Sequence, residues 1–218
     1  EQKLSKRNLK QTISILITDH LFLLLIIANI LVMFIYAHSE SSLIQYLTQA
    51  KTTDLNSLIT ALVVTNAVTI VVFQFPLLRL MKNININHRV YVGLLLFFAS
   101  QTMFALSSTE SYWSWIVSVF VLSLGEAILF PTMNIQVDRL APAHLRGSYF
   151  GATSLYSLGW SAAPIVGGLM IDYYSGQALY ILTSLTTVVV FWLYLISKYL
   201  RRPDFSSSNL LLKKVTSG

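Results

Sequence analysis

Six long apolar runs, separated by short polar segments, constrain the fold of this chain more than any other feature. A helix needs about 20 mostly apolar residues to cross a bilayer, at a rise of roughly 1.5 Å per residue. The first run has an apolar core from Leu21 to Ala37 and an amphipathic extension from Ser41 to Gln49. The sequence therefore predicts an all-α membrane protein with six transmembrane helices, at about residues 18–48, 57–80, 89–107, 112–136, 146–173 and 177–198.

The composition excludes several classes of protein. Charged residues make up only 11% of the chain, whereas an ordinary soluble domain has about a quarter. The net charge of +6 does not indicate a nucleic-acid partner, because the basic residues lie in connections and at the ends. With no cysteine, with four isolated histidines and with no catalytic sequence motif, we expect no metal site, no cofactor and no enzymatic activity.

The positive charges predict the orientation of the helices. Of the 15 Lys and Arg residues, only Lys51 falls on one side of the expected bundle. The positive-inside rule makes the other side cytoplasmic, with both termini there. An even number of spans independently requires both termini on one side. At the outer surface, we expect Tyr112, Trp113 and Trp115 to form an aromatic belt.

Glu126 is the strongest candidate for a functional residue. It lies about 13 residues into the fourth span, roughly 20 Å from its outer end. A carboxylate at that depth costs several kcal/mol and usually faces a cavity or a partner. Its apolar neighbours favour the protonated acid, and a carboxyl group that binds and releases a proton is what proton coupling requires. The alternative is a glutamate that is hydrogen-bonded to another helix for packing alone.

Other polar residues interrupt the spans. His38 and Glu40 either line an aqueous pocket with Tyr36 or form the wet end of a helix that reaches the surface. Charges at Asp138–Arg139 and at Arg146 bracket a short loop, either as a latch or as ordinary solvated charges. Single amides in other spans fit interhelical hydrogen bonding, and a minority of them are expected to touch a substrate: Asn29, Asn66, Gln74 and Gln101.

The fifth span carries a pattern of small residues. Gly159, Ala163 and Gly167 recur every four residues, and Gly168 follows them. Such a stripe lets another helix backbone approach closely. Pro164 removes a backbone hydrogen bond and favours a kink. We expect Pro76 and Pro131 to act in the same way in the second and fourth spans.

Three segments together resemble the C-terminal half of major facilitator superfamily transporters, most closely the multidrug-resistance branch of drug:proton antiporters. These segments are residues 124–131 (LGEAILFP), residues 138–140 (DRL) and residues 146–151 (RGSYFG). The glycine pattern of the fifth span is similar to the family's antiporter motif, with Ala163 in place of one glycine. The loop at residues 79–85 departs from the family's basic loop motif, because it lacks both the Asp and the Gly.

The resemblance implies a twelve-helix fold made of two six-helix bundles, each an inverted three-plus-three repeat. Residues 1–17 would end a central cytoplasmic linker, residues 18–200 would form helices seven to twelve, and residues 201–218 would form a cytoplasmic tail. The chain would then be a piece of a longer protein of the plasma membrane, whose N-terminal half is its partner. An acidic residue at the position of Glu126 takes part in proton coupling in related exporters.

The sequence thus favours a proton-coupled exporter of amphipathic small molecules that works by alternating access. The cavity would be lined by Tyr36, Glu40, Asn66, Tyr156 and Trp160, with Glu126 carrying the proton. Two alternatives remain open. One is a facilitator or symporter for a sugar, lipid or peptide. The other, from a different class, is a six-helix module that dimerises as a channel or scaffold.

Overall fold

The computed structural model describes residues 12–109 and 111–202. Within these ranges the chain is helical and contains no β-strand. Most of the expected linker end at residues 1–17, and of the expected tail at residues 201–218, lies outside the described residues. In these described ranges, 6 helical segments are long and apolar enough to cross a membrane. The prediction of an all-α protein with six transmembrane helices is therefore confirmed.

The helices follow the predicted spans closely. The first span comprises α2 (His20–Glu40) and α3 (Ser42–Gln49), and the next three are α4 (Leu55–Leu80), α5 (Ile86–Leu106) and α6 (Tyr112–Leu140). The fifth comprises η1 (Ala143–Leu145), α7 (Arg146–Ala152), η2 (Thr153–Tyr156) and α8 (Ser157–Tyr173). The sixth comprises α9 (Gly176–Ile196) and η3 (Ser197–Tyr199).

The first span is interrupted at Ser41, where the predicted amphipathic extension begins as the separate helix α3. The hydroxyl of Ser41 donates a hydrogen bond to the carbonyl oxygen of Ala37 (2.8 Å), and that of Ser39 donates to the carbonyl of Tyr36. Serine hydroxyls that bond back to helix carbonyls in this way weaken and bend helices. The break separates a membrane-crossing apolar helix from one with a polar side.

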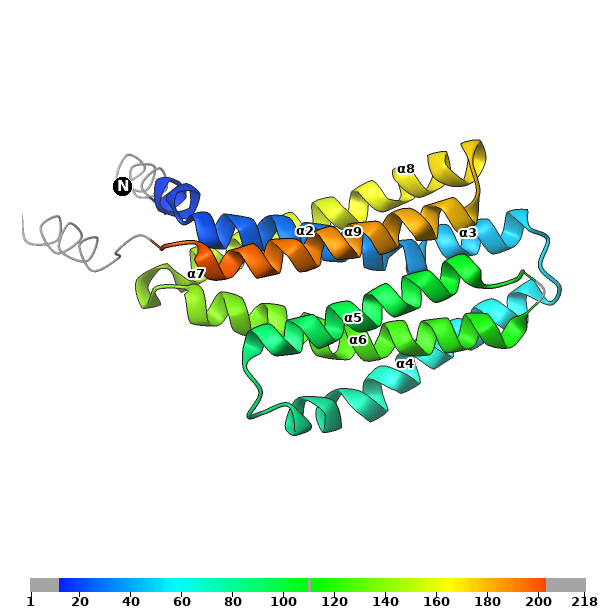
Figure 1. Cartoon of the computed structure of the whole chain (residues 1–218), viewed down its shortest axis with the longest axis horizontal. Coiled ribbons are helices and arrows are strands. Elements are labelled where there is room, and N and C mark those ends of the chain that lie inside the picture. The colour runs from blue at the N-terminus through cyan, green and yellow to red at the C-terminus, as the bar shows by residue number, and fades with distance from the viewer. Residues whose placement is uncertain (1–11, 110, 203–218) are drawn as a thin grey trace, which may run out of the picture.

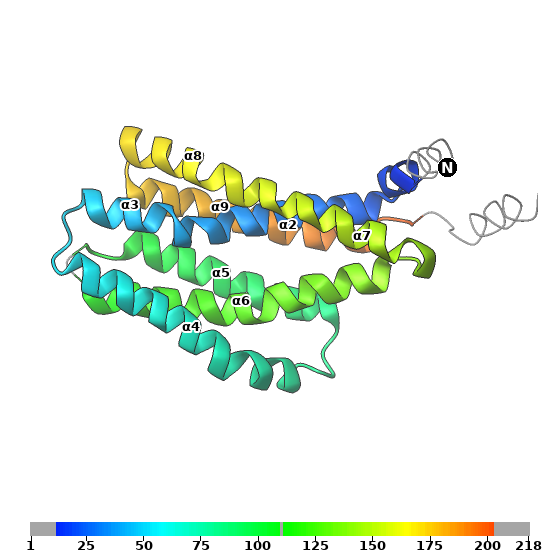
Figure 2. The same ribbon diagram turned by 180° about the vertical axis from the view of Figure 1, so that it is seen from behind.

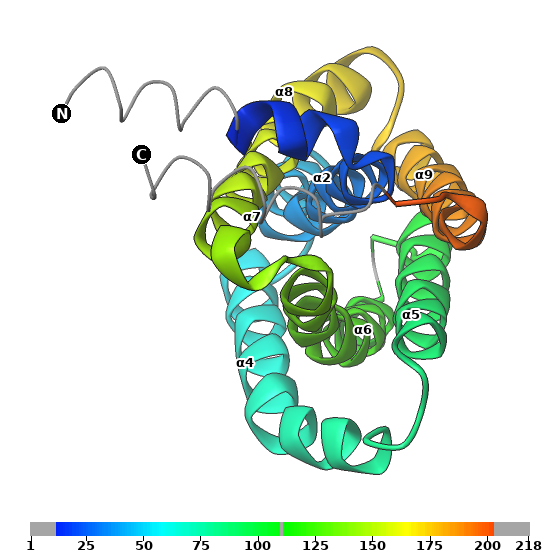
Figure 3. The same cartoon turned by 90° about the vertical axis from the view of Figure 1, so that its left-hand side faces the viewer.

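Figures 1 and 3 show the spans as two groups of three helices that lie along a common axis. In one group α6 packs against both α4 and α5, and in the other α2 packs against both α8 and α9. Contact between α5 and α9 joins the groups on one side. From behind, α3 lies between α8 and α4 (Figure 2), and it contacts both.

Both ends of the described chain lie at the same end of the bundle, on the left in Figure 1. This end also holds the α4–α5 and α6–α7 connections, and we call it the basic end. Its exposed or half-exposed basic side chains include those of Arg79, Lys82, Arg139, Arg146, Lys198 and Arg202.

A buried carboxylate ties the two chain ends together at the basic end. The side chain of Asp19 is fully buried, and it caps α2 by accepting a hydrogen bond from the backbone N–H of Phe22 (3.2 Å). It also accepts from the hydroxyl of Tyr149 (2.8 Å) and pairs with the guanidinium of Arg202 (2.7 Å). A buried carboxylate with several donors is well compensated, so the network fixes α7 and the end of the sixth span onto α2.

We expect Tyr149→Phe to lower the free energy of unfolding by about 1.5 kcal/mol, because a bond to a charged acceptor is lost in a buried site. Unfolding of the purified full-length protein in a denaturing detergent titration measures the effect. Tyr199→Phe is the matched control, since Tyr199 is 84% exposed. An equal change in the two variants would contradict the structural role given to Asp19.

Candidate functional site

Glu126 is the middle residue of α6, and its side chain is half-buried. The amide Nδ2 of Asn66, on α4, donates a hydrogen bond to its Oε2 atom (2.8 Å). The same amide nitrogen lies 3.0 Å from the Oγ atom of Ser123, one turn earlier on α6. An interhelical bond therefore holds the carboxyl group at the centre of the span, toward α4.

A second carboxyl group comes from α2. The hydroxyl of Tyr36 donates a hydrogen bond to Oε1 of Glu40 (3.3 Å), one turn later on the same helix. The same hydroxyl also lies close enough to interact with the carboxyl group of Glu126. Tyr36 thus stands between an exposed carboxyl group on α2 and a half-buried one on α6. A phenol hydroxyl in this position can donate one hydrogen bond and accept another, so it can link the two carboxyl groups.

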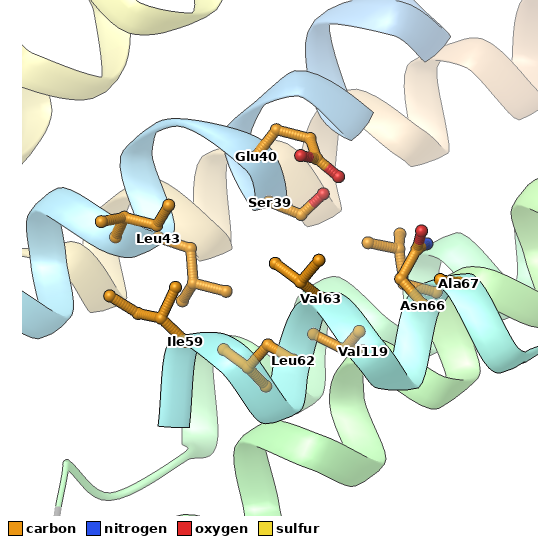
Figure 4. Close-up of a pocket in the computed structure, with 11 residues that line it drawn as sticks. Ser39, Glu40, Leu43, Ile59, Leu62, Val63, Asn66, Ala67 and Val119 are labelled. Carbon is orange, nitrogen blue, oxygen red and sulfur yellow. The ribbon is translucent and has the colours of Figure 1, made fainter. Parts of the chain in front are cut away.

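Glu40 and Asn66 border a cavity of about 200 Å³ between α2, α3, α4 and α6, and Asn66 links it to Glu126. Figure 4 shows Glu40 and Asn66 projecting into this space from facing helices. Ser39 adds a hydroxyl, and the remaining walls are apolar, formed by side chains such as Leu43, Leu62 and Val119. A few polar groups in an otherwise apolar concave site are typical of binding pockets for small molecules.

Aromatic rings surround Tyr36. Its ring centroid lies 5.0 Å from that of Phe130, 5.7 Å from that of Trp160 and 6.4 Å from that of Phe97. Trp160 extends from α8 and is 41% exposed. The structure therefore brings five of the six residues singled out from the sequence into one region: Tyr36, Glu40, Asn66, Glu126 and Trp160.

Tyr156 belongs to a different cluster, nearer the basic end. Its hydroxyl accepts a hydrogen bond from Nδ2 of Asn29 (2.9 Å), and Oδ1 of Asn29 accepts from the hydroxyl of Tyr194 (2.6 Å). The hydroxyl of Tyr194 also lies 3.3 Å from Oε1 of Gln136. This network joins α2, α6, α9 and η2, so Tyr156 packs helices together at a distance from the cavity beside Glu126.

Three neighbours of the site were absent from the sequence-based candidates. Ser123 precedes Glu126 by one helical turn, and that spacing alone places both on one face of α6. Phe97 and Phe130 carry no comparable signal, because an aromatic residue in an apolar span reads as ordinary packing. Their place beside Tyr36 depends on the rotation of α5 and α6, which the sequence leaves open.

The small residues of the fifth span face α2. Gly159, Ala163 and Gly167 are buried there, whereas Gly168 is half-buried and Pro164 is exposed. A Cβ atom added at Gly159 would overlap the backbone of Ile30 and Phe34, and one added at Gly167 would overlap Ser42. The close approach of two helix backbones that the stripe predicted is thus present between α8 and α2.

Two other expectations need correction. Trp115 is fully buried, and its indole N–H donates to the carbonyl of Ser108 (3.1 Å), whereas Trp113 is 72% exposed as a belt residue should be. His38 is fully buried between α2 and α8, with Nδ1 2.8 Å from the hydroxyl of Ser42, and so it is not at a wet helix end.

Asp138 and Arg146 form an ion pair across the short connection after α6, and their side chains are 43% and 57% exposed. A pair with that exposure is worth under about 1 kcal/mol, which favours ordinary solvated charges over a latch.

Asn29, Asn66 and Gln101 make the interhelical bonds expected of them. Within the described ranges, no group of three His, Asp or Glu side chains is placed to hold a metal ion.

In the described residues, six apolar spans around an intramembrane carboxyl group and a partly polar cavity define a multi-pass α-helical membrane protein. Comparison with known families identifies it further. Residues 1–157 match the family model of the Major Facilitator Superfamily, and the chain belongs to this family. Members of this family are transporters and not enzymes, in agreement with the sequence analysis.

Several curated proteins are similar to this chain. The uncharacterized MFS-type transporter YqjV of Bacillus subtilis (strain 168) is 29% identical over 174 residues, which cover 79% of this chain and 42% of that protein. The uncharacterized MFS-type transporter YdeE of Escherichia coli (strain K12) is 26% identical over 190 residues, covering 87% and 48% respectively. The chain thus spans about half the length of these relatives.

Proposed function

We propose that this chain is the C-terminal six-helix half of a proton-coupled transporter that exports amphipathic small molecules by alternating access. The observation that carries the proposal is the position of Glu126. Its carboxyl group lies at the centre of a membrane span, bonded to Asn66 and facing Tyr36 beside a cavity. Ionisable groups at that depth mark ion pathways and proton relays far more often than packing.

Glu126 is the proposed proton site, because its carboxyl group already contacts Asn66 and faces Tyr36. Glu40 is exposed and reaches the cavity, so it would meet substrate and is not required to carry the proton. A proton taken up at Glu126 would neutralise its carboxylate and loosen the bond from Asn66. Each proton that crosses the membrane supplies a free energy of about 2.3 kcal/mol per 100 mV of membrane potential. The pH gradient adds about 1.4 kcal/mol per pH unit.

Two observations support a missing N-terminal half. The chain spans about half the length of its relatives. In addition, α4 and α8 bury little of their apolar surface, with exposed side chains such as Val64, Val71, Phe75 and Ile165. Helix α4 lines the cavity, and α8 carries Trp160 against Tyr36, so a second six-helix bundle packed on these two helices would complete the wall. Substrate would then contact α2, α4, α6 and α8.

We further propose that both termini are cytoplasmic and that the protein lies in the plasma membrane. The distribution of Lys and Arg supports the orientation, because among the described residues every Lys and Arg except Lys51 lies at the basic end. The proposed partners are a small-molecule substrate, protons, the lipid bilayer and the N-terminal half. Membership of a transporter family argues against a channel or scaffold module, whereas a facilitator or symporter remains the principal alternative.

Transport by the full-length protein in vesicles with an acidic interior tests the proposal. A gradient of two pH units can sustain about a hundredfold accumulation of substrate for one-for-one exchange with protons. We expect fluorescent amphipathic compounds to accumulate and a protonophore to abolish the accumulation. Uptake that ignores the gradient would indicate a facilitator, and gradient-driven uptake of sugars or peptides alone would overturn the assignment to amphipathic substrates.

A further inference from the structure

A second and larger cavity, of about 420 Å³, opens at the basic end between α2, α5, α6 and the segment from η3 to Arg202. Its polar wall includes Asn87, Arg139, Lys198 and Arg202. Arg139 follows Glu126 by 13 residues on α6, which corresponds to roughly 20 Å along the helix. This cavity is therefore separate from the proposed transport site, and nothing in the proposed transport cycle uses it.

The positive charge of this cavity is not balanced by the acids around it. Asp19 is engaged by Arg202 and by the hydroxyl of Tyr149, and Asp138 is engaged by Arg146. In the part of the chain that the structure describes, no carboxylate forms an ion pair with Arg139 or Lys198. Both of these side chains are exposed at the cavity.

A neighbouring ring holds Lys198, and Arg89 adds to the positive potential near α5. The ammonium of Lys198 lies 5.1 Å from the ring centroid of Tyr91, within range of a cation–π contact that keeps it beside α5. The guanidinium of Arg89 is buried behind the α4–α5 connection and donates to the carbonyl oxygens of Lys82 (2.9 Å) and Ile84 (3.2 Å). Its charge is thus shared with backbone carbonyls and lies close to the N-terminus of α5.

Apart from Asn85, Gln136 and Ser197, the rest of the wall is apolar. Leu21 and Leu25 from α2, Ile86 from α5 and Leu140 from α6 line the cavity beside its basic groups. The cavity lies where α5 begins and α6 ends, which is the level of the membrane surface for helices that cross the bilayer. A phosphodiester joined to acyl chains combines one negative charge with apolar groups at that level, so its chemistry matches both parts of the wall.

We infer that this cavity binds the phosphate of an anionic phospholipid headgroup, with Arg139 and Lys198 as its principal contacts. The orientation proposed above places the basic end in the cytoplasmic leaflet, where anionic lipids attract basic side chains by about 1 kcal/mol for each residue. A soluble phosphate compound offers the same anion without the acyl chains, and the experiment separates the two sources.

Native mass spectrometry of the full-length protein, in detergent with equal amounts of phosphatidylglycerol and phosphatidylcholine, tests the inference. Phosphatidylglycerol should be retained in preference to phosphatidylcholine. The double variant Arg139→Gln/Lys198→Gln should weaken this retention about fivefold for each charge removed, and about thirtyfold in total. Displacement of the bound lipid by inorganic phosphate would support the anion site and assign it to soluble phosphates.

Two control variants make the result decisive. Arg79→Gln/Lys82→Gln removes two exposed charges from the same end but outside the cavity, and it should leave retention unchanged. Arg139→Lys/Lys198→Arg keeps the charges and should keep most of the binding. The inference is overturned if the first control loses as much retention as the neutral cavity variant, or if the charge-preserving variant loses it completely. The readout is lipid retention, so it stands whether or not the protein exchanges protons.

Discussion

Replacing Glu126 with glutamine is expected to abolish proton-driven transport while the protein still folds and inserts. Glutamine has nearly the same shape, and its amide oxygen can accept the hydrogen bond from Asn66 that Oε2 of Glu126 accepts in the structure (2.8 Å). It cannot bind and release a proton at physiological pH. Under a gradient of two pH units, accumulation of substrate should fall from about a hundredfold to none.

The vesicle assay measures this result directly, and Glu40→Gln is its matched control. Glu40 lines the cavity next to Glu126 and also contacts Tyr36, but it is exposed and lies on α2. We expect Glu40→Gln to keep gradient-driven accumulation, even where it changes the affinity for substrate. Normal coupling in Glu126→Gln, or its loss only in Glu40→Gln, would remove Glu126 from the proposed role and move the proton to α2.

The membrane spans could be predicted because length and hydropathy nearly determine them. Each apolar run is long enough to cross a bilayer, and few charges interrupt it. The residues at which the spans end were less certain. Helix α6 continues beyond the predicted end at residue 136 to Leu140, through polar residues that lie at the membrane surface, since a helix need not end where its apolar surface ends.

The site was predicted only in part, because sequence shows how deep a residue lies but not which way its helix is rotated. Glu126 and Asn66 stood out as polar residues in apolar spans, and they bond to each other. Tyr36 and Tyr156 looked equivalent as cavity candidates, yet one faces Glu126 and the other bonds to Asn29. Trp115 was placed at the membrane surface by its depth, but its face of α6 points into the core.

The second large effect, a loss of stability, is expected from substitution of Gly159, where α8 crosses α2. A methyl group added by Gly159→Ala would overlap the carbonyl oxygen of Ile30 and come within 2.8 Å of the backbone nitrogen of Phe34. Backbone atoms of a packed helix cannot rotate aside as a side chain can, so the two helices must separate. We expect a loss of about 3 kcal/mol in the free energy of unfolding, at the upper end of the usual cost of overpacking.

Gly168→Ala is the matched control on the same helix. A Cβ atom there would meet only the side-chain amide of Gln45, at 3.9 Å, which is an ordinary contact. Alanine favours a helix over glycine by about 1 kcal/mol, and this gain is common to both variants, so it cancels in their difference. Unfolding of the full-length protein by denaturing detergent gives that difference. If both variants are equally stable, the close approach of α8 to α2 is not what the small-residue stripe provides. If only Gly159→Ala is destabilised, the stripe stabilises the packing of these two helices, whether or not they move against each other during transport.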